Sequence, residues 1–311
     1  MSIKRRIKEL LPHNIIYIYS IVRLFPKYVS AIWKSRNESY PLINFYTDEQ
    51  TVDLIIHERK SLSRFGDGEF LWMNGEFLDS FQTYSDKFSK DLIHAFQSKD
   101  SNLLIGIPYG IVNSTKCNIH AKMHWKIMKS DFYKRIVKFS DLDCTYVNAS
   151  ITRPYIDYTD YEFSKKNFEN LKRIWDKKDI VFVEGEKTKL GMGNDLFDNA
   201  KSIKRIICPS INAYESKDKI KRSILNNVSI DTMIIAALGP TASILASEMT
   251  EIGYQFIDIG HVDIEYMWFL RRTKIRESID GKYVNESGKR SCSDLYDNDI
   301  KYRNSVIDIV L

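Results

Sequence analysis

Short apolar runs recur along this chain, and each is followed by a segment in which apolar residues have a helical spacing. Seven runs have the isoleucine, valine and leucine content of buried strands: 61–65, 103–107, 144–147, 180–183, 203–208, 233–238 and 256–259. Helical patterns cover 86–96, 115–139, 161–175, 215–226 and 241–253, and a capping-box pattern at Thr47 and Gln50 predicts a further helix to about residue 60. Strands buried on both faces read as such continuous runs. The alternation predicts an α/β fold with a doubly wound, mostly parallel sheet and helices on both faces.

The first 45 residues differ from the rest of the chain in charge. Eight lysine and arginine residues against two glutamates give residues 1–40 a net charge of +6, whereas the remainder carries −1. A nearly neutral body excludes a nucleic-acid footprint across the whole protein. Because no repeat or low-complexity linker divides the rest, we predict a basic helical arm over 1–45 and one folded domain over 46–311.

Within the arm, basic residues interleave with an apolar run that begins at Ile15 and is broken by Ser20 and Arg23. This run is shorter than the roughly 20 apolar residues that span a bilayer. A basic amphipathic helix can lie on an anionic membrane surface. It can equally pack on the main domain with its basic face in water, and the sequence leaves both interpretations open.

The residues after the first predicted strand are Arg64, Gly66, Asp67, Gly68 and Glu69. In a parallel sheet, ligands bind beyond the carboxyl ends of the strands. The glycines permit a tight turn, and two carboxylates on that turn suit Mg²⁺ or Mn²⁺, which take oxygen ligands and keep diphosphate oxygens in their shell. The arginine is suited to pair with these carboxylates or with a phosphate. The alternative is a polar turn that holds a structural ion pair.

A second glycine turn follows the very apolar run 233–238. Gly239 and Pro240 precede Thr241, which is a good N-cap for the next predicted helix. Free backbone N–H groups at a helix N-terminus attract anions. This segment is therefore a candidate seat for a diphosphate, and the alternative is a simple strand–helix turn.

Four further polar residues lie beyond later predicted strands: Glu184, Asp195, His261 and Asp263. The three carboxylates are candidates for a base that deprotonates a substrate hydroxyl. The histidine is a candidate contact for a phosphate or a substrate ring. Each also has a structural interpretation, as a solvated loop charge, a helix cap or a structural histidine.

Several other side chains stand out in the sequence but do not predict a functional site. His120 and His124 lie four residues apart, but the glutamate of a zinc-protease motif is missing between them, so we do not predict a zinc site. The aromatic residues, including Tyr155, Tyr158 and Trp175, are expected mainly in the core. The cysteines show no close pairing, which is typical of reduced thiols in a cytoplasmic protein. The four are Cys117, Cys144, Cys208 and Cys292.

Six collinear segments resemble the GT-D-type glycosyltransferases of bacteria, a family found in capsule and adhesin glycosylation loci. The segments are 63–69, 150–155, 183–186 with 193–197, 207–213, 237–242 and 258–266. They span about residues 60–285, and the arm lies outside them. Thr188, Lys189 and Met267 depart from the family pattern, in which we expect Ser-Arg and an acidic residue.

The resemblance implies a Rossmann-like domain with a D-x-E metal motif, in which Asp67 and Glu69 lie beside Mn²⁺ or Mg²⁺. It implies that a hexose such as glucose moves from a UDP-sugar to a glycan acceptor, lipid-linked or on a glycoprotein, in surface polysaccharide or glycoprotein biosynthesis. It also implies that the other segments complete the donor pocket. That adds Arg153, Asn194 and Asn212 to the candidate donor-binding residues Arg64, Gly66, Gly68, Gly239, Pro240, Thr241 and His261.

Two other classes of protein compete with this hypothesis. A nicotinamide-dependent oxidoreductase predicts a glycine fingerprint directly after the first strand, and Gly191 and Gly193 lie elsewhere and lack the third glycine. A non-catalytic, membrane-associated assembly protein of a polysaccharide system predicts nucleotide binding without turnover. The missing fingerprint argues against an oxidoreductase. The complete D-x-E pair argues against a non-catalytic assembly protein, but more weakly.

Overall fold

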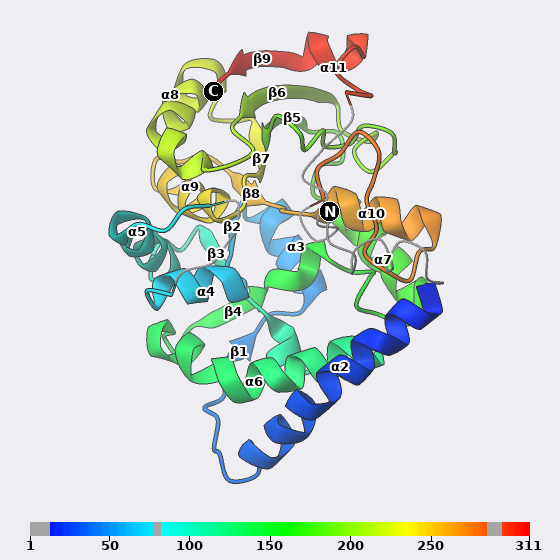
Figure 1. The fold of residues 1–311 in the computed structure, drawn as a ribbon. Helices are drawn as coiled ribbons and strands as arrows, with labels where there is room; N and C mark the ends of the chain where they lie inside the picture. The colour runs from blue at the N-terminus through cyan, green and yellow to red at the C-terminus, as the bar shows by residue number, and fades with distance from the viewer. Residues whose placement is uncertain (1–12, 77–81, 285–293) are drawn as a thin grey trace.

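The computed structural model of the chain describes residues 13–76, 82–284 and 294–311. Its centre is a nine-stranded sheet in the order β1-β4-β3-β2-β8-β7-β5-β6-β9, and every strand pair is parallel (Figure 1). The strands are β1 Asn44–Phe45, β2 Ser61–Arg64, β3 Leu103–Ile107, β4 Thr145–Asn148, β5 Asp179–Gly185, β6 Ser202–Cys208, β7 Met233–Ala237, β8 Phe256–Asp258 and β9 Val306–Ile309. The predicted α/β class with a mostly parallel sheet is therefore confirmed.

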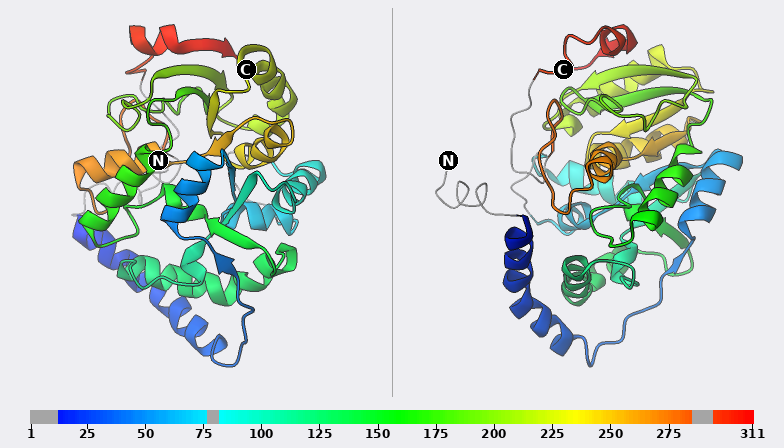
Figure 2. Two further views of the ribbon diagram at one scale, coloured as in Figure 1. Left: turned by 180° about the vertical axis from the view of Figure 1, so that it is seen from behind. Right: turned by 90° about the vertical axis from the view of Figure 1, so that its right-hand side faces the viewer.

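Helices cover both faces of the sheet (Figures 1 and 2). One face packs against α3 (Asp48–His57), α7 (Tyr161–Lys172) and α10 (Val262–Arg271). The other packs against α4 (Asp67–Met73), α5 (Asp86–Phe96), α6 (Ile119–Phe139), α8 (Lys217–Asn227) and α9 (Pro240–Thr250). Successive side chains of β5 alternate between the two layers, as the pleat of a strand requires. This two-sided burial explains why the strands read as continuous apolar runs.

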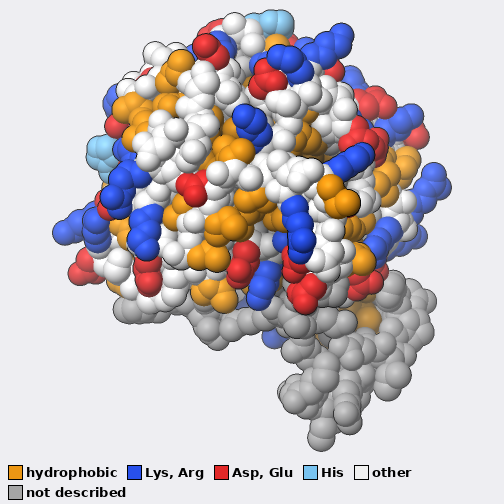
Figure 3. Space-filling model, turned by 90° about the horizontal axis from the view of Figure 1, so that it is seen from above, with side chains coloured by type: hydrophobic (Ala, Val, Ile, Leu, Met, Phe, Trp, Pro, Cys, Tyr) orange, Lys and Arg blue, Asp and Glu red, His pale blue; other side chains and the backbone are white. Residues whose placement is uncertain are grey.

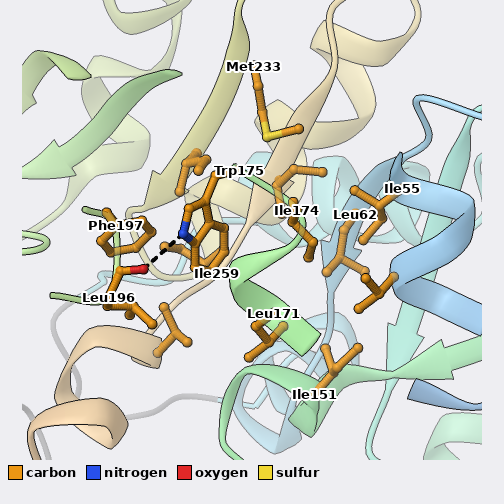
Figure 4. Packing of buried hydrophobic residues seen from close by; sticks show 14 of the residues in the cluster. Ile55, Leu62, Ile151, Leu171, Ile174, Trp175, Leu196, Phe197, Met233 and Ile259 are labelled. Carbon is orange, nitrogen blue, oxygen red and sulfur yellow. Dashed lines mark hydrogen bonds between the residues drawn. The ribbon is translucent and has the colours of Figure 1, made fainter. Parts of the chain in front are cut away.

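In the core on the α3 and α7 side, Trp175 combines a large apolar ring with one hydrogen-bond donor. Trp175 is fully buried, and its Nε1 donates a hydrogen bond to the carbonyl oxygen of Leu196 at 2.9 Å (Figure 4). The ring also lies 4.7 Å from that of Phe197. The loop after β5 is therefore anchored to the core, as predicted for a mainly structural tryptophan.

The N-terminal arm forms helix α2 (His13–Lys34), which runs along α6 on the outside of the molecule (Figure 2). Ser20 and Arg23, which break the apolar run in the sequence, do not interrupt the helix. By length and composition, Ile15–Lys34 is apolar enough to cross a membrane. Strand β1 then adds residues 44 and 45 to the sheet edge, just before the expected domain boundary.

Over the face nearest β9 and α11 (Ile300–Ser305), acidic and basic side chains are interspersed (Figure 3).

The local predictions fail mainly at short elements. The capping box at Thr47 and Gln50 is present at the start of α3. The two edge strands β1 and β9 were missed, because neither contains a continuous apolar run. Helices α4 and α10 were missed because each begins within a few residues of a strand end, where the sequence was interpreted as a turn. Of the four cysteines, three are free thiols, and Cys292 lies outside the described residues.

Candidate functional site

The two central strands, β2 and β8, are joined at their carboxyl ends by Arg64. Its Nη2 and Nε donate to the side chain and the carbonyl oxygen of Asp258, each at 2.8 Å, and its Nη1 donates to Thr152 Oγ1 at 2.8 Å. Burial raises the pKa of Asp258, and the guanidinium opposes that shift. Gly260 has φ +47°, and a Cβ there would lie 2.1 Å from Arg64 Nη2. The arginine is thus mainly a clamp between strands, and the glycine is required to accommodate it.

The D-x-E carboxylates do not lie on an irregular turn, as the sequence interpretation had it. They occupy the first turn of α4, whose N-cap is Gly66. Glu69 Oε2 accepts a hydrogen bond from the Gly66 amide at 2.8 Å, which leaves Oε1 outside that bond, and desolvation raises the pKa of Glu69 to about 7. Asp67 is exposed, and one of its oxygens accepts from the Gly68 amide at 3.0 Å. Two carboxylates of one helix turn therefore present oxygens at the centre of the sheet edge.

This pair fits a hard divalent cation that shares its shell with a substrate. Within the described ranges, no three histidine, cysteine or acidic side chains gather as a ready cation cage. Mg²⁺ is commonly held by one or two carboxylates together with substrate phosphates, so a complete protein cage is not required. Asp67 and Glu69 supply oxygen donors of the kind that Mg²⁺ and Mn²⁺ prefer.

A hollow of about 90 Å³ lies at the same carboxyl edge of the sheet, beyond β5, β6, β7 and β8. Asp67 and Glu69 do not line it, but Gly260, which lies against Arg64, does. Gly239 and His261 line it, and they are the N-caps of α9 and α10. Neither N-cap provides a side-chain hydrogen bond to its helix. Two helix N-termini with their positive dipole ends thus converge on one hollow.

The sequence predicted that Thr241 is the N-cap of α9, and the structure shows that the N-cap is Gly239. Gly239, with φ +55°, caps α9, Pro240 occupies the first turn, and Thr241 is fully buried one residue further on. The fixed φ of proline suits the first helical position, and the glycine accepts the unusual backbone conformation. The predicted glycine turn is present, but its backbone rather than a threonine hydroxyl faces the hollow.

The three carboxylates considered as a base have their oxygens engaged by other groups. Glu184 is buried, accepts from the Leu190 amide at 2.7 Å and pairs with Arg205. Asp263 is buried, accepts from Gly191 N and pairs with Lys282. Through these contacts Glu184 ties the loop after β5 to β6, and Asp263 ties it to α10. Asp263 also lines the hollow.

Asp195 lies elsewhere. It accepts hydrogen bonds from Lys172 Nζ at 2.9 Å and from Tyr266 Oη at 2.8 Å, and it does not line the hollow beside Gly239. The hydrogen bond from Lys172 lowers the pKa of Asp195. A carboxylate whose ionised form is stabilised in this way is a weak proton acceptor.

The residues added by the family resemblance mostly support loops. Asn194 donates to Asp263 Oδ1 at 2.8 Å. Asn212, with φ +53°, accepts from the amide of Thr83 at 2.8 Å. Arg153 Nε lies 3.4 Å from Glu265 Oε1. The predicted segments lie along one edge of the sheet, but the sequence could not distinguish residues that line the hollow from residues that hold it.

Several lining residues were not predicted individually. Gln82, Thr188, Ser210 and Tyr283 reach the hollow from four different segments. Thr188 is one of the positions where the chain departs from the family pattern. Its neighbour Lys189 is buried and pairs with Asp297 at 2.6 Å. The departure from Ser-Arg therefore changes one lining residue and one structural ion pair.

Comparison with known proteins identifies the family to which the sequence and the fold are similar. The sequence model described as the glycosyltransferase GT-D fold matches residues 62–287. The chain is 34% identical over 260 residues to glycosyltransferase GlyD of Streptococcus pneumoniae, and 34% identical over 266 residues to a probable glycosyl transferase, Gly, of Streptococcus gordonii. These matches cover 82% and 84% of this chain but only 30% and 37% of the relatives. The chain thus spans about a third of the length of both.

Solved structures show the same similarity over nearly their whole length. A structure of the domain of unknown function 1792, described as a distinct glycosyltransferase fold, has a TM-score of 0.78 at 32% identity. That match covers 91% of this chain and 99% of the other. A glycosyltransferase with this domain from Streptococcus sanguinis also has a TM-score of 0.78, at 29% identity, and covers 87% of this chain and 100% of its own.

Proposed function

The chain belongs to the family of glycosyltransferases with the GT-D fold, and we propose that it moves a hexose such as glucose from a UDP-sugar to a glycan acceptor. One observation carries this proposal. The D-x-E carboxylates at the end of β2 share one carboxyl edge of the sheet with a hollow on which the N-termini of α9 and α10 converge. Oxygen ligands for a cation and anion-attracting amides are the two features that a sugar diphosphate needs.

In the proposed reaction, an acceptor hydroxyl oxygen bonds to the anomeric carbon while the bond from that carbon to the diphosphate oxygen breaks. The hydroxyl loses its proton, and the electron pair of the broken bond leaves with the nucleoside diphosphate. Amides at the starts of α9 and α10 stabilise the negative charge that grows on this leaving group. Mn²⁺ or Mg²⁺ at Asp67 and Glu69 would supply further charge neutralisation when bound.

The second part of the proposal concerns where the acceptor is presented. We propose that α2 holds a cytoplasmic protein at the inner face of the membrane, beside a lipid-linked or protein-linked acceptor. One side of α2 contacts α6, and Ala31 on that side is buried. The other side exposes apolar residues every three or four positions: Ile15, Ile18, Val22, Phe25, Val29 and Trp33. Arg23 and Lys27 are exposed beside this stripe and match an anionic lipid surface.

Donor hydrolysis tests the enzymatic part of the proposal. Purified protein is incubated with UDP-, GDP- and dTDP-hexoses, with Mn²⁺ or with chelator, and released nucleotide is measured. We expect release from a UDP-hexose that chelator abolishes and that Asp67→Ala and Glu69→Ala lose. Glu49→Ala is the matched control, because Glu49 is an exposed acid in the first turn of a different helix, α3.

The possible results separate the competing classes. Metal-dependent UDP binding without release, in the presence of candidate acceptors, favours the non-catalytic assembly protein. A protein that does not bind UDP contradicts both this alternative and the proposal.

Vesicle sedimentation tests the membrane part. We expect binding to vesicles that contain phosphatidylglycerol, weakening with salt, and loss of binding when Val22, Phe25 and Val29 are all replaced by serine. Leu225→Ser, at an exposed position of α8, is the control. Equal sedimentation of the triple variant and the wild type would contradict a role for the stripe.

A further inference from the structure

A second and larger cavity opens on the same edge of the sheet. It has a volume of about 280 Å³ and lies at the carboxyl ends of β1, β4 and β3, on the other side of β2 from the hollow beside Gly239. Of the described residues, none lines both spaces. Its volume approaches that of a small-molecule site.

The walls of this cavity combine aromatic faces with planar polar groups. Phe45 and Tyr109 meet edge to face at 5.1 Å, and the rings of Tyr158 and Phe163 lie 4.9 Å apart. An aromatic ring presents a flat apolar surface, which matches the C–H face of a pyranose. Trp125, from α6, adds an indole to this wall.

The polar part of the wall is balanced in charge. Asp48 and Asp157 line the cavity together with Lys116 and Arg153. Asn148, which also lines it, donates to Asp48 Oδ1 at 3.2 Å. Two carboxylates against two cations suit a neutral, hydroxyl-rich ligand better than a diphosphate, which would face repulsion from the carboxylates.

The tryptophan is held in place by a glycine. A Cβ at Gly110 would lie 2.3 Å from the Trp125 indole, so only a glycine lets the ring lie against this turn. The preceding residue on α6, His124, contacts the indole edge to face at 5.2 Å. The indole wall therefore depends on the turn that follows β3.

His124 also connects the cavity with the D-x-E pair. Burial lowers the pKa of this imidazole, and the charges of Asp67 and Asp157 both oppose that shift. One carboxylate belongs to the proposed cation site and the other to the cavity wall, so both lie within electrostatic range of a single side chain. Contacts place the two side by side: Arg64, three residues before Asp67, donates to Thr152 Oγ1 at 2.8 Å, and Arg153, next to that threonine, lines the cavity.

From this arrangement we infer that the cavity is the acceptor site, which binds an uncharged sugar ring of the acceptor glycan against Trp125 and Tyr109. The inference rests on the proposed function. It places the donor beyond β5, β6, β7 and β8, the acceptor beyond β1, β4 and β3, and the D-x-E carboxylates at β2 between them. It also assigns Trp125 a place in the site, with His124 packed against the indole.

Ligand-observed NMR with p-nitrophenyl glucoside, galactoside and N-acetylglucosaminide tests this assignment, and UDP binding with Mg²⁺ is measured separately by calorimetry. We expect at least one glycoside to bind the wild type in the presence of UDP and Mg²⁺. Trp125→Ala and Gly110→Ala should weaken it about tenfold or more, and Trp125→Phe should restore part of the loss. UDP binding should change less than twofold in all three, which also shows that they fold. Leu225→Ala serves as the control.

Three results would overturn the inference. One is that no glycoside of the panel binds the wild type. Another is that the glycoside binds all variants equally well. The third is that Trp125→Ala loses UDP together with the glycoside, which would make the cavity part of the nucleotide site. If the wild type binds a glycoside in the cavity but no UDP, the proposed function fails, and only the cavity's role as a sugar site stands.

Discussion

Two groups of acidic side chains lie along the carboxyl edge of this sheet, and they differ in what their oxygens contact. In the first turn of α4, Asp67 is exposed and Glu69 accepts one amide hydrogen bond. At the end of β5 and the start of α10, Glu184 and Asp263 are buried, and each is paired with a cation and a backbone amide. The first pair keeps oxygens available for a ligand, whereas the second has its bonding capacity satisfied within the protein.

This difference separates binding from support. A buried carboxylate must be paired to remain charged, so its partners are part of the fold. A carboxylate at an opening can remain hydrated until a ligand displaces the water. Substitutions in the two groups should therefore affect different measurements: stability for the buried pair, and activity for the D-x-E pair.

The largest expected effect is on stability, at Glu184. Glu184→Ala leaves the Arg205 guanidinium buried without its carboxylate, since the two side chains are 0% and 5% exposed. Removal of one partner of a buried pair costs about 3–5 kcal/mol. Urea denaturation should show this loss in the free energy of unfolding. A double variant, Glu184→Leu with Arg205→Met, should recover much of it, because no unpaired charge remains. A loss below about 1 kcal/mol in the single variant would contradict a supporting role.

The converse effect is expected at Asp67. Asp67→Ala should lower metal-dependent donor hydrolysis by on the order of 10²–10³-fold, the scale seen when one group that stabilises transition-state charge is removed. Its free energy of unfolding should change by less than about 0.5 kcal/mol, because the side chain is exposed. Both quantities are measured on the same preparation. A large loss of stability with little change in rate would reverse the comparison.

A glycine next to the clamp sharpens the same comparison. Gly260→Ala would bring a Cβ within 2.1 Å of Arg64 Nη2 at a residue with φ +47°. The guanidinium would have to leave Asp258, so we expect a loss of roughly 1–3 kcal/mol together with reduced donor hydrolysis. Gly253→Ala is a matched control, since that residue also has a positive φ, +94°, but its Cβ would meet only Ile230 at 3.6 Å. Equal losses in the two variants would mean that backbone strain, rather than the clamp, is responsible.

The sequence was sufficient to predict the sheet, because burial on both faces leaves a mark in each strand. Runs such as 180–183 and 233–238 contain the apolar residues that both layers require. Strand β1 has only two residues and lies at the edge, so it bears no such mark. Helix α4 begins two residues after Phe65, and its glycines were interpreted as a turn rather than as an N-cap.

The roles of the acidic residues could not be separated from the sequence. Glu184 and Arg205 are 21 residues apart, and Asp263 and Lys282 are 19 apart, so only the folded chain brings them together. The D-x-E pair was recognisable because its two carboxylates and their glycines are adjacent in the chain. Local chemistry is thus readable from a sequence, whereas the pairing that uses up a carboxylate depends on the fold.

The smallest effect is expected at Asp195. Like Asp67 it is exposed, and like Glu184 and Asp263 it is paired with a cation. Its side chain is 58% exposed and pairs with Lys172 at 2.9 Å. Exposed pairs contribute about 0–1 kcal/mol, so Asp195→Asn should lower stability by no more than that and leave donor hydrolysis within about twofold.

The stability that this pair contributes should depend on pH. The hydrogen bond from Lys172 lowers the pKa of Asp195 below its unfolded value of about 3.9. The contribution of the pair should therefore be complete above that pH and vanish as the pH falls through the folded pKa. A double-mutant cycle with Lys172→Met, followed by urea denaturation between about pH 3 and pH 7, measures this coupling. A large loss of hydrolysis in Asp195→Asn with unchanged stability would instead restore Asp195 as the base.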